Sequence, residues 1–345
     1  MGSPETRVNE LSAAKPSVAG LARRRPRTSA TYVVRFAPVV LPWVMLAALV
    51  AIYSLRQEGV LSREELNLDA AATLTLLLVA TGQTIVILLG GIDLSVGGII
   101  SVSTALAATR FGDGGSDMAV WTLAIVVLGA AAGAVNGVLI ARLRLQPFIV
   151  TLATWSIWSG VAFWLLPTEG GTIPESFIGW VDNSYLGLTS PVWLVLALVV
   201  LWLWFKRTRL GVAIKATGSS ENSAFLSGVP TSATTIVAYA LSGVFAAFAG
   251  LFLVTQTASG SPTVGNDYIL NSVAAVVIGG TSLFGGRGGL GGTIAGAFVL
   301  TMIANVIFAY DLESFWSPIA YGVLLILAVL ANSLTELYAR RQAYR

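Results

Sequence analysis

The sequence lacks two residue types on which most metal sites and many enzyme active sites depend. Its 345 residues contain no cysteine and no histidine. Without cysteine there are no disulfides, thiol nucleophiles or iron–sulfur clusters. Without histidine the usual zinc and haem ligands are missing, as are the H-E-x-x-H and Ser–His protease arrangements. We therefore expect no metal site and no enzymatic activity.

Lysine is scarce as well, and its placement excludes a nucleotide-binding loop. The lysines are Lys15, Lys206 and Lys215, and none of them follows a glycine. A Walker A loop needs a Gly-Lys pair to hold the phosphates. We expect that this chain does not hydrolyse ATP itself.

Charge is the third scarcity, and it decides the class of protein. Charged residues make up 11% of the chain and hydrophobic residues 55%, with a mean hydropathy of +0.80. A soluble domain carries about 25% charged residues. A chain this apolar cannot cover its surface with polar groups, so we predict an all-α integral membrane protein.

Long intervals between charges locate the membrane spans, since a helix needs about 20 apolar residues to cross the bilayer. We expect about ten transmembrane helices, two of them irregular: the third is short, and the eighth is short and rich in glycine. The expected spans fall within residues 36–55, 70–91, 94–109, 117–142, 144–169, 191–206, 234–257, 267–287, 287–311 and 313–336.

The distribution of basic residues fixes the expected orientation. An even number of spans puts both termini on one side of the membrane. If that side is cytoplasmic, every Lys and Arg lies inside except Arg56, Arg63 and Arg110, as the positive-inside rule requires. We therefore expect a disordered basic cytoplasmic tail over 1–35, a transmembrane domain over 36–335 with a cytoplasmic loop over 206–232, and a basic cytoplasmic tail over 336–345.

A glycine-rich cluster over 90–98 lies where the second span meets the third. Interrupted, glycine-rich segments at membrane depth are typical of transport pathways. Asp93 can cap the following helix by accepting a hydrogen bond from a backbone N–H near Ser95 or Val96. Direct handling of substrate or protons by this carboxylate is the alternative. The expected helix break and pathway residues here are Gly91, Asp93, Ser95 and Gly97.

A second cluster over 278–292 is too rich in glycine to be helical throughout. It predicts a close approach of helices followed by a tight cytoplasmic turn, with further small residues at Gly296 and Ala297 packing closely. It has no lysine and no preceding soluble strand, so nucleotide binding is not expected. The expected turn residues are Gly279, Gly280, Gly285, Gly286 and Arg287.

The loop over 206–232 contains the pattern of a very short helix. Ser219 or Ser220 can cap its N-terminus, and Gly228 can end it. About two turns of helix are not stable alone in water. Because Phe225 and Leu226 offer apolar surface, we expect this helix to dock against a partner protein; packing on its own loop is the alternative.

Three stretches resemble a known family: G-I-D-L-S-V-G over 91–97, L-Q-P-F-I-V-T-L over 145–152, and A-A-V-V-I-G-G-T-S over 274–282 with G-G-R-G over 285–288. Over about 35–335 the chain resembles permease subunits of ATP-binding-cassette (ABC) importers of the ribose/xylose/galactose type. These motifs are specific for the family and not for one substrate. The loop 216–229 also aligns with the family's coupling segment, from which it departs at Ser219, Ser220 and Phe225.

The resemblance implies import of a monosaccharide (pentose or hexose) or a similar polyol across the bacterial inner membrane. A second permease subunit would complete the pathway, an external or periplasmic binding protein would deliver substrate, and a separate ATPase would bind the ATP. No cofactor and no nucleic acid are expected, and lipid surrounds the chain. The residues expected to couple to the ATPase are Ser220, Glu221, Ala224, Phe225, Leu226, Ser227 and Gly228.

Sugar contact uses aromatic faces and neutral polar groups, and several such residues lie inside the expected spans. Each of them either bonds a neighbouring helix or faces the pathway. They are Gln83, Asn136, Thr151, Thr154, Trp155, Trp158, Asn271 and Asn305. Tryptophans near span ends, Trp202 and Trp204 among them, are expected to anchor at the membrane interface.

Two alternatives remain at this point. A nucleoside or autoinducer importer of the same family carries the same motifs. An ion-coupled secondary transporter would need carboxylates on its pathway, and Asp93 is the one clear intramembrane carboxylate in the sequence.

Overall fold

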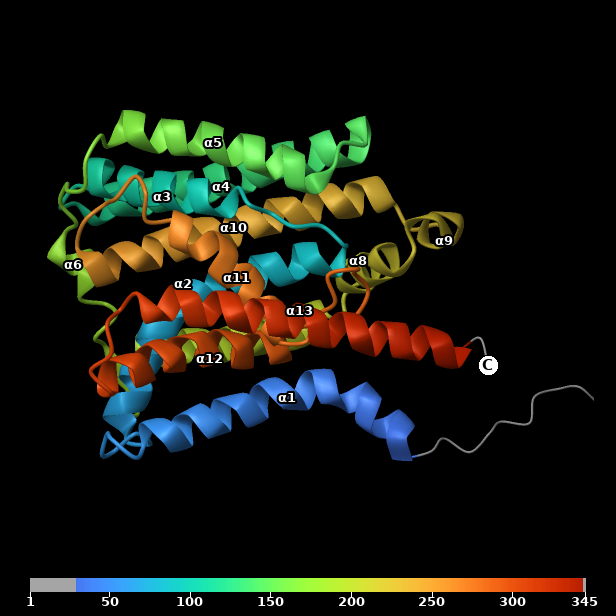
Figure 1. Cartoon of the computed structure of the whole chain (residues 1–345). Helices are drawn as coiled ribbons and strands as arrows, with labels where there is room; N and C mark the ends of the chain where they lie inside the picture. The colour runs from blue at the N-terminus through green and yellow to red at the C-terminus, as the bar shows by residue number, and fades with distance from the viewer. Residues whose placement is uncertain (1–28, 344–345) are drawn as a thin grey trace, which may run out of the picture. The chain divides into compact units, whose positions relative to one another are not determined.

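The computed structural model describes residues 29–343, which are almost wholly helical (Figure 1). Residues 37–345 form one compact unit, and the arrangement given below is that of this unit. The helices are α1 (Ser29–Tyr53), α2 (Arg63–Leu88), α3 (Val96–Arg110), α4 (Gly115–Leu143), α5 (Pro147–Leu165), α6 (Glu175–Ile178), α7 (Ser190–Phe205), α8 (Arg209–Ser219), α9 (Glu221–Leu226), α10 (Thr231–Thr257), α11 (Asn266–Ile278), α12 (Leu290–Ala309) and α13 (Trp316–Ala343).

The helices extend into both of the expected tails, and at the N-terminal one this differs from the expected disorder. Residues 1–28 lie outside the described residues, but helix α1 begins at Ser29, so residues 29–35 are helical instead of disordered. Helix α13 continues to Ala343, through most of the expected C-terminal tail. The physical reason is that a charge limits the apolar part of a helix without ending the helix itself.

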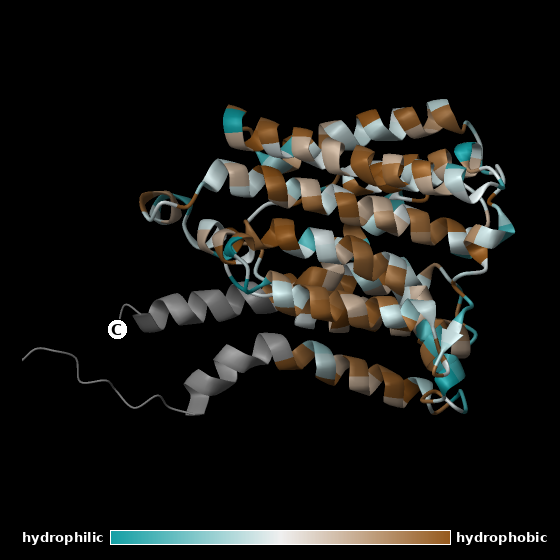
Figure 2. Ribbon diagram, turned by 180° about the vertical axis from the view of Figure 1, so that it is seen from behind, coloured by the Kyte–Doolittle hydropathy of each residue, from teal (hydrophilic) through white to brown (hydrophobic). Residues whose placement is uncertain are grey.

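Each expected span coincides with an apolar helix. Five helices are long and apolar enough to cross a membrane, namely α2, α4, α5, α10 and α12, and α7 with α8 makes a sixth if this pair, bent by 74°, is one span. Four shorter apolar helices cover residues 40–53, 96–110, 266–278 and 316–330. Figure 2 shows apolar residues along the helices and hydrophilic residues gathered near their ends.

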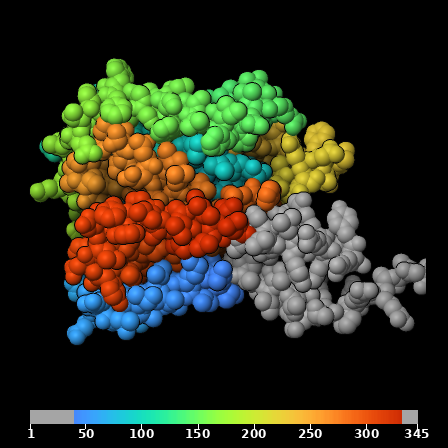
Figure 3. Space-filling view, viewed as in Figure 1, coloured from blue at the N-terminus to red at the C-terminus, as the bar shows by residue number. Residues whose placement is uncertain are grey.

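Helices α2 and α10 form the centre of the bundle. Helix α10 packs against α4, α2 and α3, and 89% of the apolar window of α2 is buried. The corresponding share for α5 is 17%, so α5 lies at the surface (Figure 3). The core of α2 includes Leu74, Leu77 and Ile87, all fully buried. A helix that is apolar on all sides is expected at such a central position.

Glycines spaced four residues apart let α4 and α10 approach closely. Gly129, Gly133 and Gly137 lie on one face of α4, and a Cβ atom at Gly137 would come within 2.6 Å of the Cα atom of Ile236 on α10. Small residues at this spacing are a common device for helix association in membranes. The sequence alone does not predict this contact.

The loops gather at two ends of the bundle. At the first, which we call the hairpin end (loops 54–62, 111–114, 166–189, 258–265 and 310–315), strands β1 (Ser184–Tyr185) and β2 (Leu188–Thr189) pair antiparallel. This small hairpin corrects the all-α expectation. Its turn residues, Leu186 and Gly187, both have positive φ angles, as a two-residue hairpin loop favours. The other end, the glycine end, holds loops 89–94, 143–146, 206–230 and 279–289.

Candidate functional site

Helix α2 breaks where the sequence predicts. The N–H of Gly91 donates to the carbonyl of Val86 at 3.1 Å, and the N–H of Gly90 donates to Ile87 at 2.8 Å. With φ of +85° at Gly90, this pair of bonds is a Schellman motif, which glycine favours because it has no Cβ atom. A side chain at Gly91 would collide with the hydroxyl of Tyr239. The chain then runs through residues 91–95 before α3 begins.

The carboxylate of Asp93 ties this break together. It is fully buried and accepts three hydrogen bonds: at Oδ1 from the N–H of Ser95 at 3.0 Å and its Oγ at 2.5 Å, and at Oδ2 from Ser242 Oγ at 2.8 Å. The bond to the N–H of Ser95 is the local capping contact expected from the sequence. Ser242 belongs to α10, so the carboxylate also joins the break to the central helix.

Polar groups from three further helices complete this network. On α4, Asn136 Nδ2 donates to Ser95 Oγ at 2.8 Å. On α2, with the amide oriented to satisfy both groups, Gln83 donates to the carbonyl of Asp93 and accepts from its N–H, each at 3.2 Å. Thr151 on α5 donates to the carbonyl of Ile92 at 3.2 Å. Gln83, Asn136 and Thr151 are fully buried, so within this subunit they bond neighbouring helices.

The second glycine cluster contains a second helix break of the same type. The N–H of Thr281 donates to Val276 at 3.2 Å and that of Gly280 to Val277 at 2.9 Å, with φ of +78° at Gly280. Gly279 packs on the backbone of Gly292 at the start of α12. The close helix approach and the turn that follows it are therefore where the sequence predicts them.

The turn after this break contacts the end of α2. The N–H of Gly286 donates to the carbonyl of Leu88 at 2.9 Å. A Cβ atom at Gly285 would lie 2.7 Å from the carbonyl oxygen of Gly218 at the end of α8. Three backbones meet here without intervening side chains, whereas Arg287 is exposed. The end of α8, the glycine turn and the end of α2 are therefore in direct backbone contact.

Helix α9 is capped at both ends as expected. Ser220 Oγ accepts from the N–H of Ser223 at 3.2 Å. At the other end, the N–H of Val229 donates to Ala224 at 3.0 Å and that of Gly228 to Phe225 at 2.9 Å, with φ of +82° at Gly228. These bonds form a third Schellman motif. They hold a six-residue helix that has no stability of its own.

The two large apolar side chains of α9 point away from the subunit. Ala224 is buried, whereas Phe225 is 64% exposed and Leu226 77% exposed. The alternative that this pair packs on its own loop is therefore wrong. Glu221 pairs with Arg144 at 3.0 Å. Both side chains are largely exposed, so this ion pair stabilises the loop only slightly.

A strip of polar side chains lies on the exposed sides of α5 and α11. Trp155 Nε1 donates to Asn266 Oδ1 at 3.1 Å, joining the two helices. Asn271 and Trp158 are half-buried and Ser156 is exposed. In Figure 3 these helices lie side by side on the viewed face. Gly97 on α3 lets α11 pack closely against α3, since a Cβ atom there would lie 2.5 Å from the Ile269 side chain of α11.

Asn305 has a different role from the other expected pathway residues. Its Nδ2 donates to Asp69 Oδ1 at 2.8 Å. Asp69 is 7% exposed and belongs to α2. The expected span begins after Asp69, whereas α2 begins six residues before Asp69 and so carries a second buried carboxylate. Asn305 donates one hydrogen bond to that carboxylate.

Comparison with known proteins decides the family. Residues 70–331 match the family described as branched-chain amino acid transport system / permease component. The chain belongs to this family. Its relatives are permease subunits of ABC importers rather than enzymes, and the permease is an integral protein of the inner membrane.

The permease is similar to several sugar permeases over most of its length. It is 37% identical over 264 residues to the ribose import permease protein RbsC of Escherichia coli (strain K12), covering 74% of this chain and 81% of that protein. It is 36% identical over 265 residues to RbsC of Bacillus subtilis (strain 168), covering 74% and 80%. The D-allose transport system permease protein AlsC of E. coli (strain K12) is 30% identical over 295 residues, covering 84% and 90%. No solved structure matches the chain.

Two further features of the permease were not predicted from the sequence. Helix α8 is capped by Thr208, whose Oγ1 accepts from the N–H of Gly211 at 3.1 Å. The signal was present, because a threonine capable of capping directly precedes an amphipathic run. Ser242 was missed because a serine inside an apolar helix shows no local sign of a partner 149 residues away.

Proposed function

We propose that the permease forms the membrane pathway of an importer that moves a monosaccharide inward and takes its energy from a separate ATPase subunit. The exposed apolar pair on α9 carries this proposal. Two large apolar side chains on a doubly capped helix are a docking surface for another protein. The relatives named for ribose and for D-allose support a pentose or hexose as the substrate.

The coupling mechanism follows from the contacts around α9. Helix α9 follows α8, and the end of α8 touches the glycine turn and the last carbonyls of α2. A partner that moves α9 therefore acts on the break held by Asp93. The permease contributes two states of different stability, and ATP binding and hydrolysis by the partner select between them.

A pull-down of the tagged permease from cells that express the whole transport system tests the proposal. We expect a stoichiometric ABC ATPase to accompany the wild type. Phe225→Asp removes apolar contact surface and places a charge there. We therefore expect the affinity for the ATPase to fall at least tenfold, which corresponds to about 1.4 kcal/mol of binding free energy or more, and less ATPase to be co-purified. Gly228→Pro, which breaks the second cap of α9, should act in the same direction.

Leu186→Asp is the matched control for the pull-down. Leu186 is 87% exposed at the hairpin end and has a positive φ that aspartate tolerates. This variant should retain the ATPase. If folded wild-type permease were purified without any ATPase, even with ATP analogues present, the proposal would be contradicted and gradient-driven transport would be favoured.

The polar strip on α5 and α11 is the proposed substrate surface, with Trp155 and Asn271 on it. Polar groups exposed on an apolar bundle need another polar or aqueous surface opposite them. A second permease subunit, identical or related, would supply that surface and enclose the pathway. Uptake of labelled ribose and D-allose, compared with nucleosides, distinguishes the proposed substrate from the nucleoside alternative.

Loop contacts support ten spans with both termini cytoplasmic. Loops expected outside contact one another, as in the bridge between Gly170 and Gly260 and the 3.0 Å bond from the N–H of Thr189 to Asn67. On the side expected inside, the glycine turn contacts the last residue of α2, as in the bond from the N–H of Gly286 to the carbonyl of Leu88. A binding protein would then approach the hairpin end, where loop 168–190 carries acidic residues and no basic ones.

A further inference from the structure

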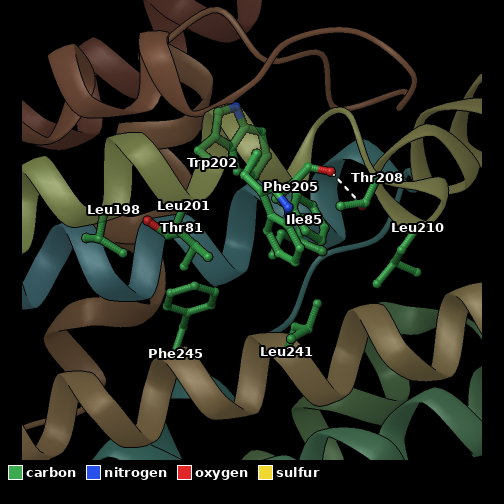
Figure 4. A pocket seen from close by; sticks show the side chains of 11 residues that line it. Thr81, Ile85, Leu198, Leu201, Trp202, Phe205, Thr208, Leu210, Leu241 and Phe245 are labelled. Carbon is green, nitrogen blue, oxygen red and sulfur yellow. Dashed lines mark hydrogen bonds between the residues drawn. The ribbon is translucent and has the colours of Figure 1, made fainter.

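An apolar groove of about 320 Å³ lies where α7 bends into α8. Side chains from α2, α7, α8 and α10 line it, with Leu201 and Trp202 on one wall and Leu241 and Phe245 facing them (Figure 4). The lining is almost wholly apolar. Thr208, at the bend, turns its hydroxyl to the carbonyl of Phe205 at 2.7 Å and so presents no free polar group to the groove.

The groove is open on the side that α7 presents to its surroundings. Leu201 is 45% exposed and Trp204 is 65% exposed, and both line the groove. Trp202, expected as an interfacial anchor, is instead buried on its wall. Since the outer face of α7 is apolar, the groove opens towards lipid tails rather than water.

Three exposed basic residues are sequence neighbours of residues that line this groove, and a fourth, Lys215, lies near Lys206. Lys206, Arg207 and Arg209 are exposed and directly follow or precede groove-lining residues, and Lys215 lies half-buried on α8. Burial and the nearby charge of Lys206 lower the pKa of Lys215, which lies on α8 outside the long apolar helices. Among the side chains that the structure describes, the one ion pair joins Arg144 to Glu221, so these four cations have no carboxylate partner.

We propose that this groove binds one acyl chain of an anionic phospholipid whose phosphate lies against Lys206, Arg207 and Arg209. Basic clusters beside apolar crevices at the cytoplasmic surface attract anionic headgroups, which supply the missing counter-charge. The proposal rests on the cytoplasmic placement of loop 206–232 in the proposed function. A bound chain would support the bend from which α8 and α9 continue, so transport should depend on anionic lipid.

Native mass spectrometry of the full-length permease, purified with its ATPase and titrated with phosphatidylglycerol or phosphatidylcholine, tests this site. We expect one tightly retained phosphatidylglycerol per permease, preferred over phosphatidylcholine by about tenfold or more.

Lys206→Gln with Arg209→Gln should abolish the preference for phosphatidylglycerol. The control Arg142→Gln with Arg287→Gln removes two exposed cations elsewhere at the glycine end and should keep it. Leu201→Trp, which narrows the open side, should weaken retention of both lipids.

Three outcomes would overturn the lipid site. The wild type could retain the two lipids equally. The two double variants could lose the preference for phosphatidylglycerol to the same extent. The groove could also retain no lipid because a second copy of the chain covers it. The ATPase in the same spectra separates the two proposals. If the ATPase is present without lipid preference, only the lipid site fails, whereas lipid preference without any ATPase counts against the importer.

Discussion

At the scale of the residue, Asp93 shows that a charge at membrane depth can be structural. Its carboxylate accepts three hydrogen bonds from two serines and is surrounded by buried amides and hydroxyls. These three hydrogen bonds offset part of the cost of burying the carboxylate. Asp69 accepts one hydrogen bond, from Asn305. Neither carboxylate lies on the exposed polar strip, so the ion-coupled alternative gains no support from them.

Asp93→Asn should lower stability and, through it, transport. The amide keeps an acceptor for Ser95, and its NH₂ group can donate to Ser242, whose hydroxyl must then accept instead of donate. A charge-assisted interhelical hydrogen bond thus becomes a neutral one, at a cost of about 0.6 to 1.7 kcal/mol. We expect the apparent melting temperature in detergent to fall by a few degrees and uptake to fall with it. Asp69→Asn should lower the melting temperature less, because Asp69 accepts fewer hydrogen bonds than Asp93. Lost uptake at an unchanged melting temperature would instead show that the charge itself takes part in transport.

The sequence predicts the local half of this network and not the distant half. The bond from the Ser95 N–H to Asp93 spans two residues, so a short motif is sufficient to predict it. Ser242 and Asn136 reach the site only through the packing of α10 and α4. Their polarity within apolar spans indicates that they have partners, but it does not say which.

At the scale of the element, gaps between charges predicted the position of the apolar helices, and glycines predicted where two of them break. Schellman motifs end α2, α9 and α11, and each depends on one glycine with positive φ. The lengths of the helices were harder to predict. Helix α2 begins at Arg63, where Ser62 caps it by accepting a hydrogen bond from the N–H of Glu65. That cap is a local signal in the sequence, whereas the partner of Asp69, Asn305 on α12, appears only in the folded structure.

Gly137→Leu should prevent the close contact of α4 with α10. A side chain there meets the backbone of Ile236, which cannot move aside as a flexible side chain can. We expect a several-fold loss of monodisperse protein in size-exclusion chromatography, because overpacking at a helix crossing costs about 1 to 3 kcal/mol or more. Gly160→Leu on α5 is the matched control, since nothing lies within 4 Å of a Cβ atom at that position. Equal yields of the two variants would show that the α4–α10 contact tolerates separation.

At the scale of the whole molecule, three breaks are linked through the glycine end. The α2 break, the turn after α11 and the end of α8 meet through backbone contacts, and α9 follows α8. The hairpin end is tied together separately, through Gly170 and Gly260 and through Asn67 and Thr189. Helix α9 is therefore connected through α8 to the break beside Asp93. This connection is the structural basis of the proposed coupling, in which a partner ATPase moves α9.

The absence of cysteine makes the proposed orientation directly testable. Any single cysteine introduced into the chain is unique, and both Leu186 and Asn222 are exposed, at opposite ends of the bundle. We expect Leu186→Cys to react with a membrane-impermeant maleimide in spheroplasts, and Asn222→Cys to react only after the membrane is opened. Arg56→Cys and Arg142→Cys extend the test to the ends of the first and fourth spans. We expect the cysteine at position 56 to react from outside and the cysteine at position 142 to react only from inside. If positions 56 and 142 both reacted from outside, an even number of spans would lie between them. The ten-span arrangement, with its cytoplasmic coupling helix, would then be wrong.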